Sequence, residues 1–487
     1  MDRIPTQEII PEDVDSRVFN LYEKKEKIYI RSMEGFFQYI RVYTGWPLLL
    51  GYFLAPWLQI EGRQALFFDL SQQQFHIFWL TLWPQDFVLL MWTLAIAAMG
   101  LFFVTTLWGR VWCGYTCPQT VWTAIFSWAE QIAEGERHQR IKLDKTPSLF
   151  SKGGFNAAGW NKVWRRGLKY CMWFGFAALT GITFIGYFYG IRDLVVDAWQ
   201  WQLPLTAVAW TVFFTLATFI NAGWMREQVC IYMCPYARFQ SAMFDKDTLI
   251  ISYDPARGEQ RGSRKKGSDY QAQGLGDCID CTLCVQVCPT GIDIRNGLQY
   301  ECIGCARCID ACDSIMDKMA YPKGLISYTT LNKMAGGEWT WKRPKLLGYG
   351  VALLVLLGLF SAVLLTRTPL RLDVLRDRGQ LYQEVAGGLI ENVYTLKVIN
   401  MTDDDRQYQL HTIGLPNARI LPDELISVPA RQMHELIIRV QANPDELNSF
   451  NTEFDFQLES VTQNAGKNLH TTTESRFFGP QPLTTQR

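Results

Sequence analysis

Eight cysteines in the middle of the chain stand at spacings that suit iron–sulfur chemistry. Residues 278–289 read C-x2-C-x2-C-x3-C-P, and residues 302–312 read C-x2-C-x2-C-x3-C. A 4Fe–4S cubane needs four thiolates, and in two-cluster ferredoxins the fourth cysteine of each run ligates the other cluster. The sequence therefore predicts two 4Fe–4S clusters, one held by Cys278, Cys281, Cys284 and Cys312 and the other by Cys302, Cys305, Cys308 and Cys288.

A pair of zinc sites is the structural alternative for these eight cysteines. Zinc is usually bound by two C-x2-C pairs that lie a dozen or more residues apart. Each run here has three cysteines at successive x2 spacings instead, so the pattern favours clusters. Pro289 follows Cys288, as is usual in such runs, whereas Asp313 follows Cys312; this difference removes no ligand.

Four further cysteines form a repeated C-x3-C-P pattern. Residues 107–122 read LWGRVWCGYTCPQTVW and residues 223–239 read GWMREQVCIYMCPYARF, and the aromatic stretch after each motif ends in an acid, Glu130 or Asp245. Residues i and i+4 share one face of a helix, so we expect each pair to present two sulfurs to one ligand. The proline is expected at a helix start or a kink. We infer two duplicated helical hairpins with related inner ends.

The ligand of these thiols stays open at the level of sequence. Soft thiolates select Cu(I), zinc or iron–sulfur clusters. Two Cu(I) sites, one four-thiolate site and a redox-active dithiol all fit the spacing of Cys113, Cys117, Cys230 and Cys234. Simple packing is the other interpretation, because free cysteine is among the most buried residue types. Packing is the favoured explanation for Cys171, Met225 and Met233.

Long apolar stretches position these motifs. Five stretches are long enough to cross a hydrocarbon core of about 30 Å, and they are 41–60, 87–109, 168–190, 203–224 and 346–366. The first is the weakest, because Arg41 and Pro47 interrupt it. The stretch His76–Trp83 is apolar but short, and we expect an interfacial or re-entrant helix there.

The distribution of Lys and Arg orients the spans. Residues 1–41 hold seven, 110–169 hold ten and 225–345 hold sixteen, whereas 61–86 and 191–202 hold one each. Under the positive-inside rule the N-terminus and both cysteine-rich loops are cytoplasmic. Five crossings then place the C-terminal part outside, in the periplasm of a Gram-negative cell. This part lacks cysteine, which agrees with an oxidising compartment. If one span is misread, the tail is cytoplasmic instead.

The fold class expected is multi-domain. It combines an α-helical polytopic membrane domain of about five spans, a bacterial-type ferredoxin domain with two clusters and a C-terminal all-β immunoglobulin-like sandwich. The β assignment rests on alternating apolar and polar residues in 393–400, 406–412, 435–440 and 454–461. The expected segments are 1–40 (cytoplasmic), 41–245 (four spans with both C-x3-C-P motifs), 246–345 (ferredoxin-type), 346–366 (last span) and 367–487 (periplasmic β domain).

Two function classes find no support in the composition. The formal net charge is zero, which gives no reason to expect nucleic-acid binding. No G-x-G-x-x-G follows a strand, so no nicotinamide or flavin domain is evident. Electrons must therefore arrive from another molecule, an unidentified cytoplasmic donor.

The order of motifs resembles the CcoG/FixG/RdxA family of cytochrome c oxidase accessory proteins across essentially the whole chain. The residues that carry the resemblance are CGYTCP (113–118), CIYMCP (230–235), CIDCTLCVQVCP (278–289) and CIGCARCIDAC (302–312). The resemblance implies a bacterial inner-membrane protein that reduces Cu(II) to Cu(I) for assembly of a cbb3-type oxidase. It also implies copper carriers or oxidase subunits as partners. By the same resemblance, Cys113, Cys117, Cys230 and Cys234 are the catalytic, copper-handling candidates.

Two alternatives to this function are carried forward. NapH-type quinol dehydrogenases share part of the motif set, so the chain is alternatively a quinol-oxidising electron-transfer subunit. A non-enzymatic assembly scaffold, with structural clusters and a β domain that binds an oxidase subunit, is the second alternative.

Overall fold

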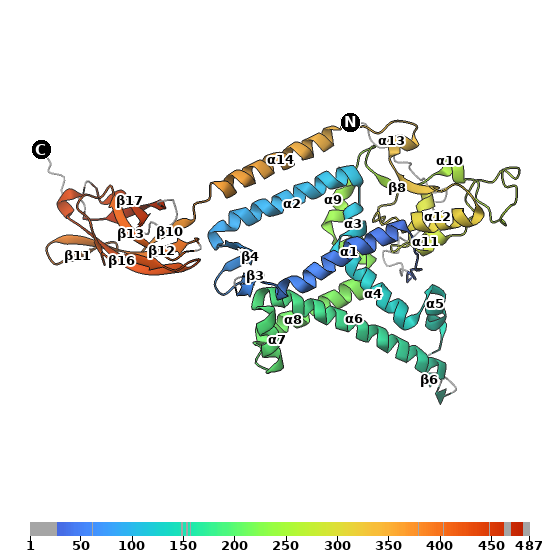
Figure 1. Cartoon of the computed structure of the whole chain (residues 1–487), viewed down its shortest axis with the longest axis horizontal. Coiled ribbons are helices and arrows are strands. Elements are labelled where there is room, and N and C mark those ends of the chain that lie inside the picture. Colours follow the sequence, from blue (N-terminus) through green and yellow to red (C-terminus); the bar gives the residue numbers. More distant parts are fainter. Residues whose placement is uncertain are drawn as a thin grey trace, which may run out of the picture. The chain divides into compact units, whose positions relative to one another are not determined.

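The computed structural model describes residues 27–480, apart from 61, 148–149, 152–153, 156, 378, 403, 448 and 462–468. Most of the expected N-terminal segment therefore lies outside the described residues. The chain divides into two compact units (Figure 1). The first contains residues 1–53, 101–185 and 203–348, and the second contains 54–100, 186–202 and 349–487. Each unit is described by itself.

Helices dominate the part of the chain before residue 245. They are α1 (Phe36–Leu54), α2 (Phe87–Trp108), α3 (Val111–Tyr115), α4 (Pro118–Glu134), α5 (Arg137–Lys145), α6 (Ala157–Tyr189), α7 (Ile191–Trp199), α8 (Leu205–Thr218) and α9 (Pro235–Met243). Two short π-helical segments, η3 (Phe219–Met225) and η4 (Val229–Met233), separate α8 from α9. Short 3-10 turns and two-residue strands complete this part, namely η1 (Ala55–Trp57), η2 (Pro84–Asp86), β1 (Gln59–Ile60), β2 (Arg63–Gln64), β6 (Phe150–Ser151) and β7 (Gly154–Phe155).

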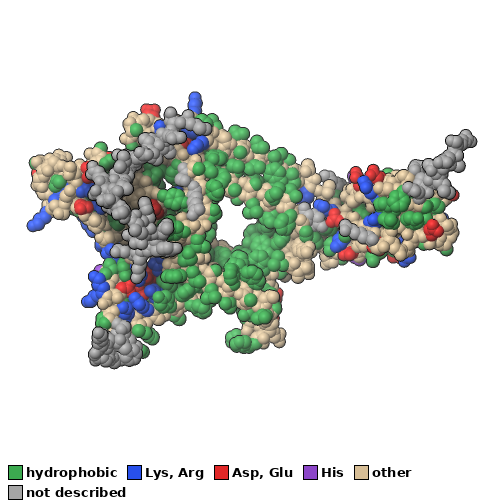
Figure 2. Space-filling model, turned by 180° about the vertical axis from the view of Figure 1, so that it is seen from behind, with side chains coloured by type: hydrophobic (Ala, Val, Ile, Leu, Met, Phe, Trp, Pro, Cys, Tyr) green, Lys and Arg blue, Asp and Glu red, His purple; other side chains and the backbone are tan. Residues whose placement is uncertain are grey.

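Four of the five predicted spans are confirmed as helices long and apolar enough to cross a membrane. They are Phe87–Trp108, Gly159–Tyr189, Leu205–Met225 and Pro344–Leu365, the last being α14. Their side chains are mostly exposed and hydrophobic, as a lipid-facing surface requires (Figure 2). The first predicted span corresponds to α1, which contains Arg41 and Pro47 and does not reach the same apolarity. The count of five crossings, and with it the side on which the C-terminal part lies, stays a prediction.

The expected helix at His76–Trp83 is wrong. Residues 66–82 form a three-stranded antiparallel sheet of β3 (Leu66–Asp69), β4 (Gln74–Ile77) and β5 (Leu80–Leu82). Strands β4 and β5 are joined by a two-residue turn in which Phe78 has a φ of 53°. Eight residues give a helix little cooperative stability, whereas aromatic and β-branched residues pair well across strands.

The ferredoxin part of the first unit is closed by a two-stranded antiparallel sheet. Strand β8 (Ile250–Tyr253) pairs with β9 (Ile326–Thr329), and α11 (Leu283–Gln286) and α12 (Arg307–Met319) lie between them in sequence. Short elements α10 (Pro255–Gly258), η5 (Ile294–Asn296) and α13 (Leu331–Met334) complete it. Residues of β8, α12 and β9 share one core with cysteines of both runs. The core therefore forms directly around the predicted cluster ligands.

The C-terminal residues of the second unit form a β-sandwich, as predicted. One sheet has the order β10 (Leu370–Arg376), β12 (Leu389–Asn400), β16 (Met433–Ala442), β14 (Arg419–Leu421), with β11 (Gln383–Val385) also on β12. The other has the order β15 (Ile426–Val428), β13 (Arg406–Ile413), β17 (Asn451–Ser460), β18 (His470–Phe478), and η6 (Pro444–Glu446) precedes β17. Inward-facing Tyr394, Tyr408, Phe456 and Phe477 are fully buried between the sheets. The alternation seen in the sequence thus corresponds to one buried and one exposed face per strand.

Candidate functional site

Two cavities lie inside the ferredoxin part, and each is surrounded by four of the predicted ligands. The four cysteines around one cavity are Cys278, Cys281, Cys284 and Cys312. The four around the other are Cys288, Cys302, Cys305 and Cys308, with Cys284 also in its wall. Apolar side chains make up most of the remaining wall of each. The structure therefore brings together both groups of four that the sequence predicts, including the exchanged fourth cysteines.

The two cysteine runs have the same backbone conformation. Asp280 and Thr282 have φ values of 53° and 54°, and the equivalent Gly304 and Ala306 have 68° and 58°. A left-handed conformation costs a residue with a side chain roughly 1–2 kcal/mol, and such strain collects at functional sites. These paired reversals turn three successive thiols toward one point, which is what a compact cluster needs.

The spacing of the thiols suits a cluster better than a single ion. Within the described ranges, no three His, Cys, Asp or Glu side chains come close enough together to hold one metal ion. Zinc would draw four ligands to within about 2.3 Å of a single centre. Thiols set around a cavity fit a larger group, so the donor set fits a cubane in both places. When bound, such a cluster supplies one-electron transfer.

The four C-x3-C-P cysteines lie at the inner ends of the two hairpins, but not as expected. Cys113 is in α3, whereas Cys117 lies beyond the end of that helix and is the N-cap residue of α4. Cys230 is in the π segment η4, and Cys234 is the N-cap residue of α9. The prediction of two sulfurs on one continuous helical face is therefore wrong, because the following proline begins a new helix in both motifs.

The four thiols nevertheless gather in one place. Burial, followed by the nearby thiols of Cys117, Cys230 and Cys234, raises the pKa of the Cys113 thiol to about 12. The Sγ atom of Cys113 lies 3.7 Å from Oε1 of Gln240, a fully buried residue of α9. Helix α9 follows the second motif, so this contact joins the two hairpins. Cys171 lies apart from this group, exposed on α6.

The two motifs differ by one residue in the spacing from arginine to cysteine, and their backbones differ at the same place. The second motif has one more residue between its arginine and its first cysteine than the first motif has. The π-helical segment η3 ends directly before this arginine, η4 begins one residue before the cysteine, and a π turn holds about one residue more than an α turn. The extra residue is thus absorbed locally, and both Cys-Pro steps begin helices in equivalent positions.

The first motif packs directly against the ferredoxin loop that carries Cys302 and Cys305. A Cβ atom on Gly114 would lie 2.7 Å from the carbonyl oxygen of Gly304 and 3.0 Å from Cα of Cys305, so only glycine fits. Arg110 donates to the carbonyl oxygens of Cys302, at 3.1 Å, and Ala237, at 3.0 Å. This arginine therefore connects both motifs to one cluster loop.

Two tyrosines reinforce the same contact. The hydroxyl groups of Tyr115 and Tyr328 lie 3.1 Å apart, and Tyr328 donates to the carbonyl oxygen of Gly304 at 2.7 Å. The ferredoxin part is also fixed to α1, because Asp310 accepts hydrogen bonds from the backbone N–H groups of Phe37 and Gln38. The carboxylate thus caps the N-terminal end of α1.

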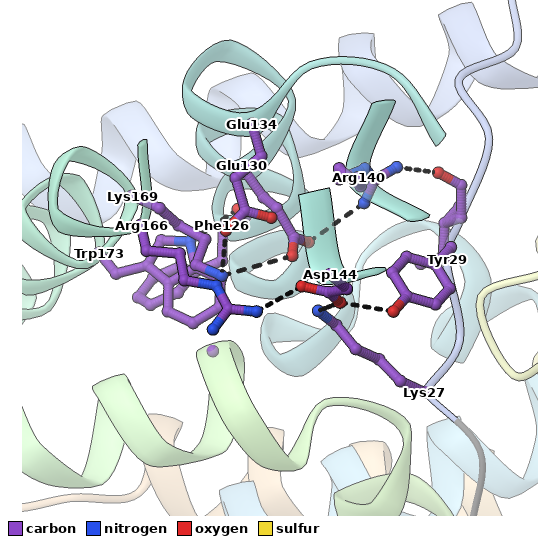
Figure 3. Close-up of polar contacts among 12 residues, drawn as sticks. Lys27, Tyr29, Phe126, Glu130, Glu134, Arg140, Asp144, Arg166, Lys169 and Trp173 are labelled. Atoms are coloured by element: carbon purple, nitrogen blue, oxygen red, sulfur yellow. Dashed lines mark hydrogen bonds and ion pairs between the residues drawn. The ribbon is translucent and has the colours of Figure 1, made fainter. Parts of the chain in front are cut away.

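A buried charge network holds the two hairpins together (Figure 3). Glu130 of α4 pairs with Arg226, at 2.9 Å, and with Arg140, at 3.3 Å, while Lys169 lies 2.6 Å from Glu134. Burial acts to raise the pKa of Glu130, but Arg226, Arg140 and Lys169 outweigh it and hold this pKa below its usual value. Because Arg226 precedes the second motif and Glu130 follows the first, the network fixes one motif against the other.

Sequence reasoning missed most of this support. The position of Glu130 at the end of the aromatic stretch was the one available signal, and its counterpart Asp245 likewise pairs with an arginine, Arg343, at 2.9 Å. Nothing in the local sequence marked Gln240 as the buried partner of a thiol.

Comparison with protein families finds iron–sulfur domains and a family-specific C-terminal domain. Residues 225–331 match a 4Fe-4S dicluster domain, residues 90–134 match a 4Fe-4S binding domain, and residues 360–480 match the IG-like fold at the C-terminal of FixG. The nitrogen fixation protein FixG of Rhizobium meliloti is 37% identical over 436 residues, which cover 82% of this chain and 81% of that protein. This chain belongs to the FixG/RdxA family.

The comparisons also give a second relative and a solved structure. Protein RdxA of Cereibacter sphaeroides is 38% identical over 427 residues, covering 82% of this chain and 85% of that protein. A crystal structure of a FixG-related protein from Vibrio parahaemolyticus shares 34% identity, covers 23% of this chain and 97% of that chain, and has a TM-score of 0.21. The family, the iron–sulfur domains and the apolar helices make this chain a membrane iron–sulfur electron-transfer protein.

Proposed function

We propose that this FixG/RdxA-family member is a cupric reductase that supplies Cu(I) for assembly of a cbb3-type cytochrome c oxidase. The observation that carries the proposal is the contact between Gly114 of the first motif and the loop of Cys302 and Cys305. It sets the first motif, which contains Cys113 and Cys117, directly against the loop of a cluster cavity. Thiolates bind Cu(I) well, so the thiols suit the product of the reduction.

The reaction is a one-electron transfer. Each Cu(II) ion gains one electron and becomes Cu(I), and no proton or bond need be exchanged with the protein. The electron comes from a low-potential one-electron donor protein on the cytoplasmic side. Cys113, Cys117, Cys230 and Cys234 are the proposed copper-handling residues, and the oxidase subunits or copper carriers that take the Cu(I) are the proposed partners.

Double variants test the copper role of the thiols. We expect purified holoprotein, given a dithionite-reduced donor, to reduce Cu(II), as measured with a chromophoric Cu(I) chelator. The Cys113→Ser/Cys117→Ser and Cys230→Ser/Cys234→Ser proteins should lose this activity and keep their iron. The matched control is Cys171→Ser, which removes an exposed thiol outside the group. Full activity in both double variants would show that the thiols do not handle copper.

A second interpretation of the same thiols is favoured by one specific observation. The 4Fe-4S binding domain matched at residues 90–134 contains only two cysteines, Cys113 and Cys117. The second motif would complete a four-thiolate set, and the four thiols would then hold a third cluster. Iron analysis separates the cases, because two clusters contain about eight iron atoms per chain and three contain about twelve.

Two further assays separate the reductase from the remaining alternatives. A quinol-oxidising subunit would show cluster reduction when quinol is added to membranes, whereas a reductase with a protein donor would not. A non-enzymatic scaffold would show no Cu(II) reduction at all, whereas loss of oxidase assembly with retained Cu(II) reduction after deletion of residues 370–487 would favour a mixed role. We expect that deletion to preserve Cu(II) reduction, because the thiols and both cluster cavities lie in the first unit.

A further inference from the structure

A cavity of about 180 Å³ lies in the first unit between the inner ends of the hairpins and the ferredoxin part. Its wall includes Cys230 of the second motif. It also includes residues that line the second cluster cavity, namely Pro289, Thr290, Ile303 and Arg307. A molecule in this cavity would therefore touch a candidate copper thiol on one side and the wall of a cluster site on the other.

The cavity is open to solvent, and its wall combines apolar side chains with polar ones. Ala124 and Trp128 of α4 line it and are exposed, so a small solute can enter. Hydroxyl and amide side chains supply much of the wall, namely Gln38, Gln119, Thr120, Thr123, Ser127 and Gln131. The hydroxyl oxygen of Ser127 is buried and has no hydrogen-bond partner within the described part of the chain. The hydroxyl and amide side chains of the wall are the polar groups available to a ligand.

Positive charge exceeds negative charge in this wall. It contains Arg41, Arg226 and Arg307, whereas Glu227 is its one carboxylate among the described residues. Arg226 is paired with Glu130. Arg41 and Arg307 form no ion pair with any described residue. Arg41 donates to the carbonyl oxygen of Gly114 and to the side chain of Gln38, and Arg307 donates to the carbonyl oxygen of Arg31.

A cluster bound in the adjacent cavity would offset the charge of Arg307 but not that of Arg41. The thiolate-ligated cluster of the adjacent cavity would share the charge of Arg307, which follows Cys305 by two residues. Arg41 comes from α1 and lines only the open cavity, so its guanidinium has no anionic partner among the residues that the structure describes. A guanidinium binds carboxylate well, since its donors match the two oxygens. The same charge would repel a free Cu²⁺ ion.

We propose that this cavity admits copper as a small anionic Cu(II)–carboxylate chelate, which delivers the metal beside Cys230. The inference rests on the proposed reductase function and names the form of its substrate. The carboxylates bind Arg41, and the metal lies toward the thiol. The cavity is large enough for a small organic chelate and too small for a protein chain.

Binding without reduction is the first test. Equilibrium dialysis of the holoprotein against radiolabelled citrate needs no electron transfer, so it stands even if Cu(II) reduction fails. We expect Arg41→Gln to weaken citrate binding about tenfold or more, because a charge-assisted contact is lost. Arg41→Lys should retain part of it. The matched control, Arg192→Gln, removes an exposed arginine of α7 and should bind citrate as the wild type does.

Replacing Arg41 also removes its hydrogen bond to the carbonyl oxygen of Gly114, which belongs to the first motif. A steric variant that leaves Arg41 in place avoids this second effect. Ala124→Phe places a ring in the cavity at an exposed position, so iron content should be unchanged and citrate binding lost. Absence of citrate binding by the wild type, or equal binding by wild type, Arg41→Gln and Ala124→Phe, would overturn the proposal. So would displacement of bound citrate by a neutral short-chain quinone, which would assign the cavity to quinol.

Kinetics with two copper complexes give the second test. With Cu(II)–citrate, Arg41→Gln should raise KM about tenfold with little change in kcat. For the cationic bis(ethylenediamine)copper(II) complex, the KM of Arg41→Gln should equal that of the wild type or be lower. An equal change in KM for both complexes would contradict the inference. Failure of the wild type to reduce either complex would instead reject the reductase function, while the dialysis result still decides what the cavity binds.

Discussion

The ferredoxin cysteines and the hairpin cysteines both gather in groups of four, yet they are positioned in different ways. In the ferredoxin part, three ligands of each group come from one short loop whose left-handed residues repeat between the runs. At the hairpins, the two pairs are separated by 112 residues in sequence, Cys117 to Cys230. Their approach depends on Arg110, Gln240 and the Glu130 network. Local loops thus define one kind of site, and tertiary contacts define the other.

The largest difference between the two regions should appear when a ligand of each is removed. Cys305→Ser takes a thiolate from a cubane, so iron should fall from about eight to about four atoms per chain and Cu(II) reduction should be lost. Cys117→Ser should lower the copper content and leave the iron content unchanged. Iron and copper analysis of both proteins, with electron paramagnetic resonance of the reduced clusters, makes the comparison. A fall in iron in Cys117→Ser would mean that the hairpin thiols hold iron, as the third-cluster interpretation requires.

The second largest effect is expected on stability, when the ion-pair network around Glu130, which supports the hairpin site and not the ferredoxin loops, is broken. Glu130→Gln would leave Arg140, Arg226 and Lys169 buried without their shared carboxylate, which costs about 3–5 kcal/mol. We expect a lower thermal midpoint and weaker copper binding with the clusters retained. The exposed pair of Lys323 and Asp317 provides the control, because Asp317→Asn should change stability by less than about 1 kcal/mol. Equal effects in the two variants would show that the network does not support the hairpins.

The same carboxylate gives a pH dependence with a defined sign. Its pKa in the folded protein lies below the usual value, so its stabilising effect is fully present above the unfolded pKa. That effect is lost as the pH falls through the folded pKa. Stability of the wild type should therefore decrease in acid more steeply than that of Glu130→Gln. Thermal unfolding between pH 7 and pH 3 measures this, and parallel curves would exclude Glu130 as the titrating group.

A smaller effect is expected where the two regions touch. Gly114→Ala puts a methyl group against the carbonyl of Gly304, and overpacking of this kind typically costs about 1–3 kcal/mol. We expect slower Cu(II) reduction with normal iron and copper content, because only the distance between the sites changes. Gly167→Ala is the control, since nothing lies within 4 Å of its Cβ position in α6. Normal rates in Gly114→Ala would show that this contact does not carry the electron.

The smallest effect should follow loss of one hydroxyl group at the same contact. Tyr328→Phe removes the hydrogen bonds to Tyr115 and to the Gly304 carbonyl, which are worth about 1 kcal/mol. The matched change at Tyr115 leaves the bond from Tyr328 to Gly304 in place, so it should have less effect. Chemical denaturation measures the loss in free energy of unfolding for each variant. A larger loss for the Tyr115 variant would indicate that the hydrogen bond from Tyr328 to the Gly304 carbonyl is unimportant.

Prediction from the sequence succeeded where local pattern determines structure. The C-x2-C-x2-C runs, the apolar helices after Phe87 and the alternating strands of the C-terminal part all have a period or spacing that one segment sets by itself. The helix expected at His76–Trp83 failed, because a short apolar stretch does not distinguish strand from helix. The expectation that the motif proline stands at a helix start is confirmed at Pro118, but the expectation that both cysteines of a motif share one helical face is wrong.

The hairpin site could be predicted only as a set of residues. Spacing indicated that Cys113, Cys117, Cys230 and Cys234 belong together, but not which contacts bring them together. Gln240 and Arg110 act through tertiary packing, and a single sequence carries no pattern for such pairs. The metal at this site and the segment boundaries stay predictions for the same reason.

The pairing of β8 with β9 has a consequence for how the protein is made. Tyr253 lies opposite Ile326 in this sheet. The two ends of the ferredoxin segment between these strands are therefore close together. A module whose ends meet can be inserted in a chain without disturbing what flanks it. During biosynthesis, the preceding and following helices can therefore enter the bilayer in their final order before any iron is loaded. Cofactor insertion can then follow membrane insertion, on a domain that is tethered at both ends to the membrane helices.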